Sequence, residues 1–187
     1  MGLSFKGQDN IWDLAFNDDV PLDLAVTVSD ADIDLLLSGL SLTRLETVSN
    51  SGTITADLSG DQTQLTAVDI KRANGGRVEM DLSGRYEALS TIDAELNGSR
   101  LLLDLTGDWL RDVDINLAGG TGNKVTLKLP QNATITVNAD SDTNEITAEN
   151  FQVDGNTYSY VTAESPTAKL DIQIAFERGQ ITLELAQ

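Results

Sequence analysis

Acidic side chains recur at fixed intervals along this sequence, and their spacing is its clearest chemical pattern. One set, Asp57, Asp81 and Asp104, occupies the same outward position in successive short repeats. A second set lies between pairs of inward aliphatic residues and comprises Glu46, Asp69, Asp93 and Asp114. Stacked repeats would hold such carboxylates about 5 Å apart, and each like-charged pair would cost roughly 1 kcal/mol even in water. The repulsion is relieved if the side chains spread into solvent, if one pKa rises, or if a cation binds between them.

These two acidic sets support three hypotheses. The first is that they are solvated surface side chains, and the second is that either set holds a weak Ca²⁺ site. The third is glycoside hydrolysis, because carboxylates one rung apart match a retaining glycosidase and alternate rungs an inverting one. That chemistry needs one carboxyl group in an apolar pocket, whereas a repeated ladder gives every rung the same environment. We therefore predict no catalytic residue and no bound cofactor, and keep all the carboxylates of both sets as weak metal candidates.

The remaining composition excludes several classes of function. The 187 residues include 30 acidic and 12 basic ones, which gives a formal charge of -18, and they include neither Cys nor His. The absence of Cys and His excludes disulfides, thiolate nucleophiles, Ser-His-Asp triads, and zinc or iron sites built from these residues. The negative charge argues against nucleic acid and anionic lipid as partners, because little in the chain would neutralise phosphates.

Alternation of apolar and polar residues over most of the chain predicts β-strands. The clearest runs are Ile54, Ala56 and Leu58; Val78, Met80 and Leu82; Leu101, Leu103 and Leu105; and Val125, Leu127 and Leu129. Each run ends in a turn, and the turn glycines Gly39, Gly60, Gly84 and Gly107 are 21, 24 and 23 residues apart. Such regular spacing indicates that one structural unit repeats along the chain.

A second set of inward apolar residues follows each turn. These residues are Leu42 and Leu45; Leu65, Val68 and Ile70; Leu89, Ile92 and Ala94; Leu110, Val113 and Ile115; and Ile135 and Val137. Each repeat closes in a cluster of small residues, where Asn50, Asn74 and Asn97 are expected to hydrogen-bond the backbone of a corner. Two strands per repeat predict an all-β, single-domain β-solenoid with coils of roughly 21–24 residues and capping strands at both ends.

The predicted domain covers residues 1–187, with N-terminal cap strands in 1–30, repeated coils in 31–139, and a C-terminal excursion with closing strands in 140–187. We expect a hairpin within residues 150–160. Trp12, Trp109, Tyr158 and Tyr160 are expected to pack in the caps or the core. A cytoplasmic leucine-rich-repeat adaptor is an alternative, because residues 89–97 fit that motif. However, its return segment is usually helical or irregular, whereas residues 53–58 alternate as a strand does.

The segment Gly119-Gly120-Thr121-Gly122-Asn123-Lys124-Val125-Thr126-Leu127-Lys128-Leu129-Pro130 resembles the Gly-x-Gly-x-Val-x-Leu-x-Leu-Pro element of bacterial toastrack domains. These domains are grouped with adhesins and with the C-terminal domain of cell-wall-active-antibiotic response proteins. Residues 20–24 and 37–45 are similar to the preceding coils of such proteins. The resemblance implies a non-catalytic, all-β domain exposed outside the cytoplasm, and it carries over no catalytic residue.

From the resemblance we expect an extracytoplasmic interaction domain of a membrane-associated bacterial protein, either an adhesin or an envelope-stress-response module. Its partner would be another protein or a second copy. Membrane attachment would come only from segments outside this chain, because no apolar run approaches the roughly 18 to 20 residues that a span requires. A cytoplasmic location stays open. The alternative function is a calcium-dependent glycan-binding or carbohydrate-active β-solenoid that uses the acidic sets.

Overall fold

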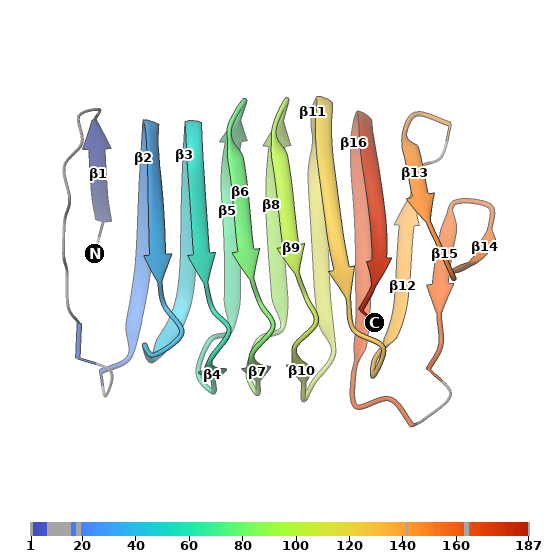
Figure 1. Ribbon diagram of the computed structural model, residues 1–187, viewed down its shortest axis with the longest axis horizontal. Helices are drawn as coiled ribbons and strands as arrows, with labels where there is room; N and C mark the ends of the chain where they lie inside the picture. The colour runs from blue at the N-terminus through green and yellow to red at the C-terminus, as the bar shows by residue number, and fades with distance from the viewer. Residues whose placement is uncertain (1, 7–15, 18–19, 141, 163–164, 187) are drawn as a thin grey trace.

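The computed structural model describes residues 2–6, 16–17, 20–140, 142–162 and 165–186, and its regular elements are all β-strands (Figure 1). The strands are β1 (Gly2–Lys6), β2 (Leu22–Leu36), β3 (Leu42–Asp57), β4 (Asp61–Gln62), β5 (Ala67–Asn74), β6 (Arg77–Asp81), β7 (Arg85–Tyr86), β8 (Thr91–Asn97), β9 (Arg100–Asp104), β10 (Asp108–Trp109), β11 (Val113–Leu129), β12 (Thr134–Ala139), β13 (Glu145–Ala148), β14 (Gln152–Asp154), β15 (Thr157–Tyr160) and β16 (Lys169–Leu185). The predicted all-β solenoid is thereby confirmed. No described segment is a helix long and apolar enough to cross a membrane.

Each coil has two long legs that meet at a corner, followed by a turn and a short third strand. In one complete coil β5 leads through Gly75 and Gly76 into β6, and β7 follows the turn. In β3 and β11, both legs belong to one continuous strand. Successive coils pair in parallel, so that the corners line up at the top of Figure 1 and the turns at the bottom.

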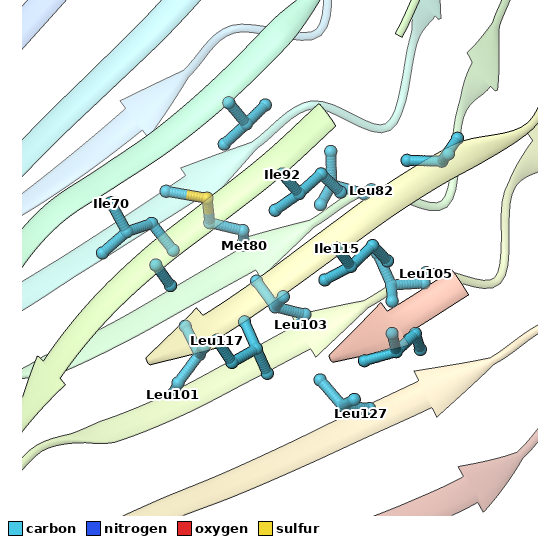
Figure 2. Packing of buried hydrophobic residues seen from close by; sticks show 14 of the residues in the cluster. Ile70, Met80, Leu82, Ile92, Leu101, Leu103, Leu105, Ile115, Leu117 and Leu127 are labelled. Carbon is cyan, nitrogen blue, oxygen red and sulfur yellow. The ribbon is translucent and has the colours of Figure 1, made fainter. Parts of the chain in front are cut away.

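The core fills the space between the two legs of every coil. The inward residues of the alternating runs are buried, with Ile54, Val78 and Leu103 fully inaccessible to solvent (Figure 2). Leu110, which the sequence pattern places inward, is instead 44% exposed, and Trp109 is buried in its place. The sequence pattern pairs Ile92 with Val113, whereas in the structure Ile92 faces Ile115 across the ladder. The inward residues of this leg are therefore Val113, Ile115 and Leu117, and the predicted register was displaced by two residues.

A second, short sheet was not predicted and consists of β4, β7 and β10. Its inward residues Gln62, Tyr86 and Trp109 are buried, and the Tyr86 and Trp109 rings stack with centroids 4.7 Å apart. Each donates a hydrogen bond to a carbonyl of a leucine in a turn: Gln62 Nε2 to Leu37 at 3.2 Å, the Tyr86 hydroxyl to Leu58 at 2.6 Å, and Trp109 Nε1 to Leu105 at 2.9 Å. These three hydrogen bonds therefore connect the short sheet to the turns.

The last strand of the chain lies inside the stack. β16 pairs in parallel with β11 on one side and with β12 and β13 on the other, so that Ile172 lies between Ile115 and Val137. The chain leaves β11, forms β12 and β13, makes the predicted hairpin as antiparallel β14 and β15 against β12, and then returns between the earlier strands (Figure 1). Sequence order alone would place β12 directly beside β11.

The N-terminal end of the stack is formed by β1 and β2. β1 pairs in parallel with residues 25–29 of β2. β2 itself runs across the predicted boundary between cap and coil at residues 30 and 31, because both of its legs stack on β3. Tyr158 is buried and Tyr160 is partly buried, whereas Trp12 lies outside the described residues.

Candidate functional site

The first acidic set forms the predicted ladder, with Asp57, Asp81 and Asp104 in register on β3, β6 and β9. Each carboxylate also accepts a hydrogen bond from the backbone N–H two residues later, from Ser59 at 2.9 Å, Ser83 at 2.9 Å and Thr106 at 3.3 Å. An aspartate that bonds its own backbone two residues on stabilises a tight turn. The repeated Asp-Leu-Ser/Thr-Gly sequence is therefore explained by turn formation.

Hydrogen bonds keep two of these carboxyl groups ionised. The hydroxyl and N–H of Ser59 lower the pKa of Asp57. Burial raises the pKa of Asp104, but hydrogen bonds from Thr106 and from Lys128 Nζ at 3.1 Å outweigh it, and the pKa falls below its usual value. A general acid needs the opposite shift. The pKa values of Asp57 and Asp104 are therefore shifted in the direction opposite to that of a general acid.

The second acidic set is in register for three of its four members. Glu46 faces Asp69, and Asp69 faces Asp93, but Asp114 lies opposite Thr91 and is out of the ladder. Asn116 occupies the fourth rung and donates a hydrogen bond to Asp93 at 2.8 Å. The predicted position of Asp114 in the ladder was wrong, because the predicted register of this leg was displaced by two residues, as it was at Leu110.

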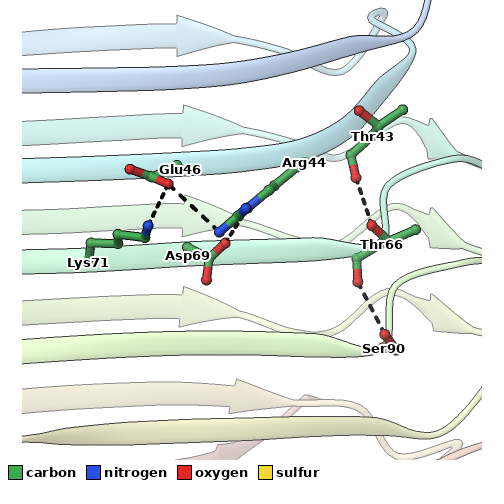
Figure 3. A network of polar contacts seen from close by, with 7 residues as sticks. All are labelled: Thr43, Arg44, Glu46, Thr66, Asp69, Lys71 and Ser90. Carbon is green, nitrogen blue, oxygen red and sulfur yellow. Dashed lines mark hydrogen bonds and ion pairs between the residues drawn. The ribbon is translucent and has the colours of Figure 1, made fainter. Parts of the chain in front are cut away.

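Basic side chains neutralise the first two rungs of this set (Figure 3). Arg44 Nε lies 2.7 Å from an Asp69 oxygen, and Lys71 Nζ lies 2.9 Å from a Glu46 oxygen. The hydrogen bond to Asp69 raises the pKa of Arg44. Beside them, the Thr66 hydroxyl donates to the Thr43 carbonyl at 2.9 Å. The chain's own cations therefore relieve the repulsion that a metal ion would otherwise relieve.

The Ca²⁺ hypothesis stays a prediction. Within the described part of the chain, no three Asp or Glu side chains are grouped so that they could hold a metal ion. If either ladder holds a calcium site, the melting temperature of the domain should rise with Ca²⁺. The rise should be lost in Asp81→Asn or Asp93→Asn. An unchanged melting temperature would reject it. The sugar platforms of the glycan hypothesis are absent from the described surface near the ladders, because Tyr86 and Trp109 are buried.

The corners carry a second kind of ladder. The Asn74 amide donates to the Asn50 side chain at 3.2 Å, and so this pair bonds side chain to side chain instead of to the backbone as predicted. Just beyond the corners, Arg77, Arg100 and Lys124 are in register. Arg77 and Arg100 line a groove of about 420 Å³ together with Gly52, Thr53, Gly75, Gly76 and Gly98.

Sequence reasoning missed this basic edge, although the signal was present. In three of the coils a basic residue directly follows the corner segment, in Gly76-Arg77, Ser99-Arg100 and Asn123-Lys124. The spacing of the three basic residues, 23 and 24 positions apart, matches the repeat. Once the coils are placed in register, these side chains form one row along the corner edge.

Comparison with known proteins supports the predicted family. Residues 1–75 match the model of the N-terminal domain of toast_rack, DUF2154. Among solved structures, the chain is similar to a "putative cell adhesion protein" from Clostridium sporogenes ATCC 15579, with a TM-score of 0.49 and 17% identity. That similarity covers 91% of this chain but only 58% of the other. No curated protein matches the chain.

The family match lies at the opposite end of the chain from the motif that first carried the resemblance. Residues 119–130 fall outside the matched range, whereas residues 20–24 and 37–45 fall within it. A toastrack-type domain fits a non-catalytic interaction role. The match over residues 1–75 confirms the predicted resemblance to toastrack domains for that part of the chain.

Proposed function

We propose that this domain is an extracytoplasmic interaction module of a membrane-associated bacterial protein, serving as an adhesin or in an envelope-stress response. It acts through contacts with another protein, and segments outside this chain attach it to the membrane. The toast_rack match supports the family setting. The structural observation that carries the proposal is an apolar side chain at the N-terminal end of the stack.

Leu36 is the terminal member of the row that contains Asp57, Asp81 and Asp104. It faces Asp57 in register, and it is 81% exposed, the highest value among the exposed large hydrophobic residues of the described chain. Every rung inside the stack at this position carries a charge, since Lys128 and Glu184 continue the row. In this row the apolar residue stands at the end position, whereas the described inner positions are charged. This supports a contact made by the N-terminal end of the stack.

The second leg of β2 also presents a strand edge. β1 pairs only with residues 25–29, and no described residue pairs with the outer edge of residues 31–36. An unpaired edge can accept a strand from another chain. Asp30 and Asp34 are exposed beside it, and so the partner that fits best combines an apolar socket for Leu36 with basic groups.

Site-specific photocrosslinking in the full-length parent protein tests this contact. A photoreactive residue at position 36 is expected to capture one defined partner in living cells, and the same residue at position 110, on the turn side of a central coil, is expected to capture none. A product of twice the parent mass would identify a second copy as the partner. Absence of any product specific to position 36 would reject the proposed contact.

Labelling of a single introduced cysteine tests the location. The chain has no Cys of its own, and Val161 is 67% exposed, so that Val161→Cys adds one accessible thiol to this domain, with the unsubstituted full-length parent as the control. A membrane-impermeant maleimide is expected to label it in intact cells. Labelling only after lysis would show that the domain faces the cytoplasm and would reject the extracytoplasmic proposal.

A further inference from the structure

At the C-terminal end of the stack, the two legs end at different rungs. On the first leg, β12 is followed outward by β15 and then by β14. On the second leg, β13 pairs with β16, and none of the described strands lies beyond it. The first leg therefore extends two rungs further than the second leg, and the outer backbone edge of residues 145–148 is unpaired within the described structure (Figure 1).

The inward side chains of β13 lack the cover that their neighbours have. Ile146 continues the row of Ile181, which is 1% exposed, and Ala148 continues the row of Leu183, which is 2% exposed. Ile146 and Ala148 themselves are only partly buried. In the rest of the stack, such inward residues are covered by a strand on each side. One more strand beside β13 would therefore complete the burial of this row.

The first leg has an uncovered inward side chain at the same end. Val153 on β14 faces Tyr158, and Tyr158 faces the buried inward residue Val137. Val153 therefore lies on the inward side of its sheet, yet it is 59% exposed. In the inner coils, the second leg covers this side of the sheet. We call the unpaired edge of residues 145–148 together with Val153 the C-terminal step.

Acidic side chains border the C-terminal step. Glu145 is exposed on the outward side of β13, Glu149 follows the strand directly, and Asp140 and Asp142 are exposed before it. Glu145 accepts a hydrogen bond from the neutral amide of Gln180 at 2.9 Å. In the described part of the chain, no Lys or Arg forms an ion pair with these four carboxylates. A strand that places a basic side chain opposite Glu145 would supply the missing charge.

The chain itself contains a strand sequence that suits these rows. The second leg of β11 reads Lys124-Val125-Thr126-Leu127-Lys128, and it pairs with the side of β16 opposite to β13. Lys124 lies in the row of Glu145, with Gln180 between them. Apolar residues at alternate positions, flanked by lysines four residues apart, therefore already pack against this leg of the sheet from its other side.

From these observations we infer that the C-terminal step accepts a β-strand of another protein, in which apolar residues alternate with polar ones and a lysine or arginine faces Glu145. The strand adds to β13 in parallel, as the strands of this leg do, and its apolar side chains cover Ile146 and Ala148. The step lies at the end opposite Leu36, and binding there does not depend on the contact proposed for that residue.

A second copy of this domain fits the step less well. If its N-terminal end continued the stack in the same register, residues 31–36 would pair with β13 and Asp32 would lie opposite Glu145. Two carboxylates on neighbouring rungs repel one another. A basic strand from a different protein avoids that repulsion.

NMR titration of the domain with a synthetic peptide tests the inference. The peptide has the sequence of residues 123–129, Asn-Lys-Val-Thr-Leu-Lys-Leu. It is used at low ionic strength and at high concentration, because a single added strand binds weakly and its charge contacts are screened by salt. Chemical-shift changes are expected at residues 145–148 and at Val153. The same peptide with glutamate in place of both lysines is expected to cause none there.

Charge exchange locates the contact. Glu145→Lys should weaken binding of the lysine peptide about tenfold, because an attraction becomes a repulsion, and it should allow the glutamate peptide to bind. Glu95→Lys makes the same change at an exposed position of β8 in a central coil and should leave binding unchanged. Val153→Ser should weaken binding by a few-fold, because it removes apolar surface from the step.

Three results would overturn the inference. The first is an absence of shift changes at residues 145–148 with the lysine peptide. The second is equal weakening by Glu95→Lys, which would indicate unspecific attraction to the acidic surface. The third is a set of changes at residues 31–36 and 145–148 that grows with domain concentration alone, which would assign the edge to a second copy. Circular dichroism of each variant confirms that it is folded before affinities are compared.

Discussion

The acidic residues of this chain act chiefly as local structural partners. Asp57, Asp81 and Asp104 hold turns, and Glu46 and Asp69 are paired with Lys71 and Arg44. The sequence correctly predicts the ladder positions of these acidic residues and of Asp93, but not that of Asp114, because only the former have a spacing that follows the repeat. It could not predict that the carboxylates are already engaged, because hydrogen bonds and ion pairs between coils depend on the register.

The turn glycines provide the sharpest test at this scale. A Cβ on Gly84 would lie 2.1 Å from the Gly60 carbonyl, whereas a Cβ on Gly39 would meet nothing within 4 Å. Gly84→Ala should therefore lower the free energy of unfolding by about 3 kcal/mol, as expected when a close contact forces the backbone apart. Gly39→Ala should change it by less than about 0.5 kcal/mol. Urea denaturation measures both, and equal effects would contradict the close stacking of the turns.

The lowered pKa of Asp104 gives a prediction about pH. Because the folded state holds this carboxylate ionised, its stabilising contribution is present above the unfolded pKa of about 3.9 and is lost as the pH falls through the lower folded pKa. Asp104→Asn should therefore cost about 1 kcal/mol at pH 7, and the difference from wild type should disappear in acid. Asp61→Asn removes an exposed charge as the control. A difference that persists at low pH would show that the charge of Asp104 is not responsible.

Among the elements, the long legs were predictable and the short strands were not. Alternation fixed the inward faces of β3, β6, β9 and the second leg of β11, because a period of two over several residues is a strong signal. A strand of two residues has no period. β4, β7 and β10 therefore escaped prediction, and without β10 the predicted register of the following leg was displaced by two residues.

The neighbouring residues Trp109 and Leu110 test this part of the fold. Trp109 is 1% exposed, stacks on Tyr86 and bonds the Leu105 carbonyl, whereas Leu110 is 44% exposed. Trp109→Ala should lower the free energy of unfolding by about 3–5 kcal/mol. Leu110→Ala should lower it by less than about 1 kcal/mol. Chemical denaturation of the two variants decides the matter, and a larger loss for Leu110→Ala would mean that the sequence-based face was right.

At the scale of the whole molecule, the C-terminal strand β16 is inserted into the stack, and β12, β15 and β14 lie beyond it. β16 separates β12 from β11, so that coils adjacent in sequence are not adjacent in space. The sequence could not reveal this insertion, because Leu170, Ile172 and Ile174 have the same inward pattern as Ile135 and Val137. The position of β16 also fixes which strands form the C-terminal end of the stack.

Disulfide crosslinking in a chain without natural cysteines tests this arrangement most directly. Asn116 faces Gln173, and Gln173 faces Asn138. Neighbouring rungs are about 4.8 Å apart, within the reach of a disulfide, whereas two rungs span roughly 9.6 Å and exceed its limit of about 7 Å. We predict that Asn116→Cys with Gln173→Cys crosslinks on oxidation and that Asn116→Cys with Asn138→Cys does not. The reverse result would place β12 beside β11 and contradict the inserted strand.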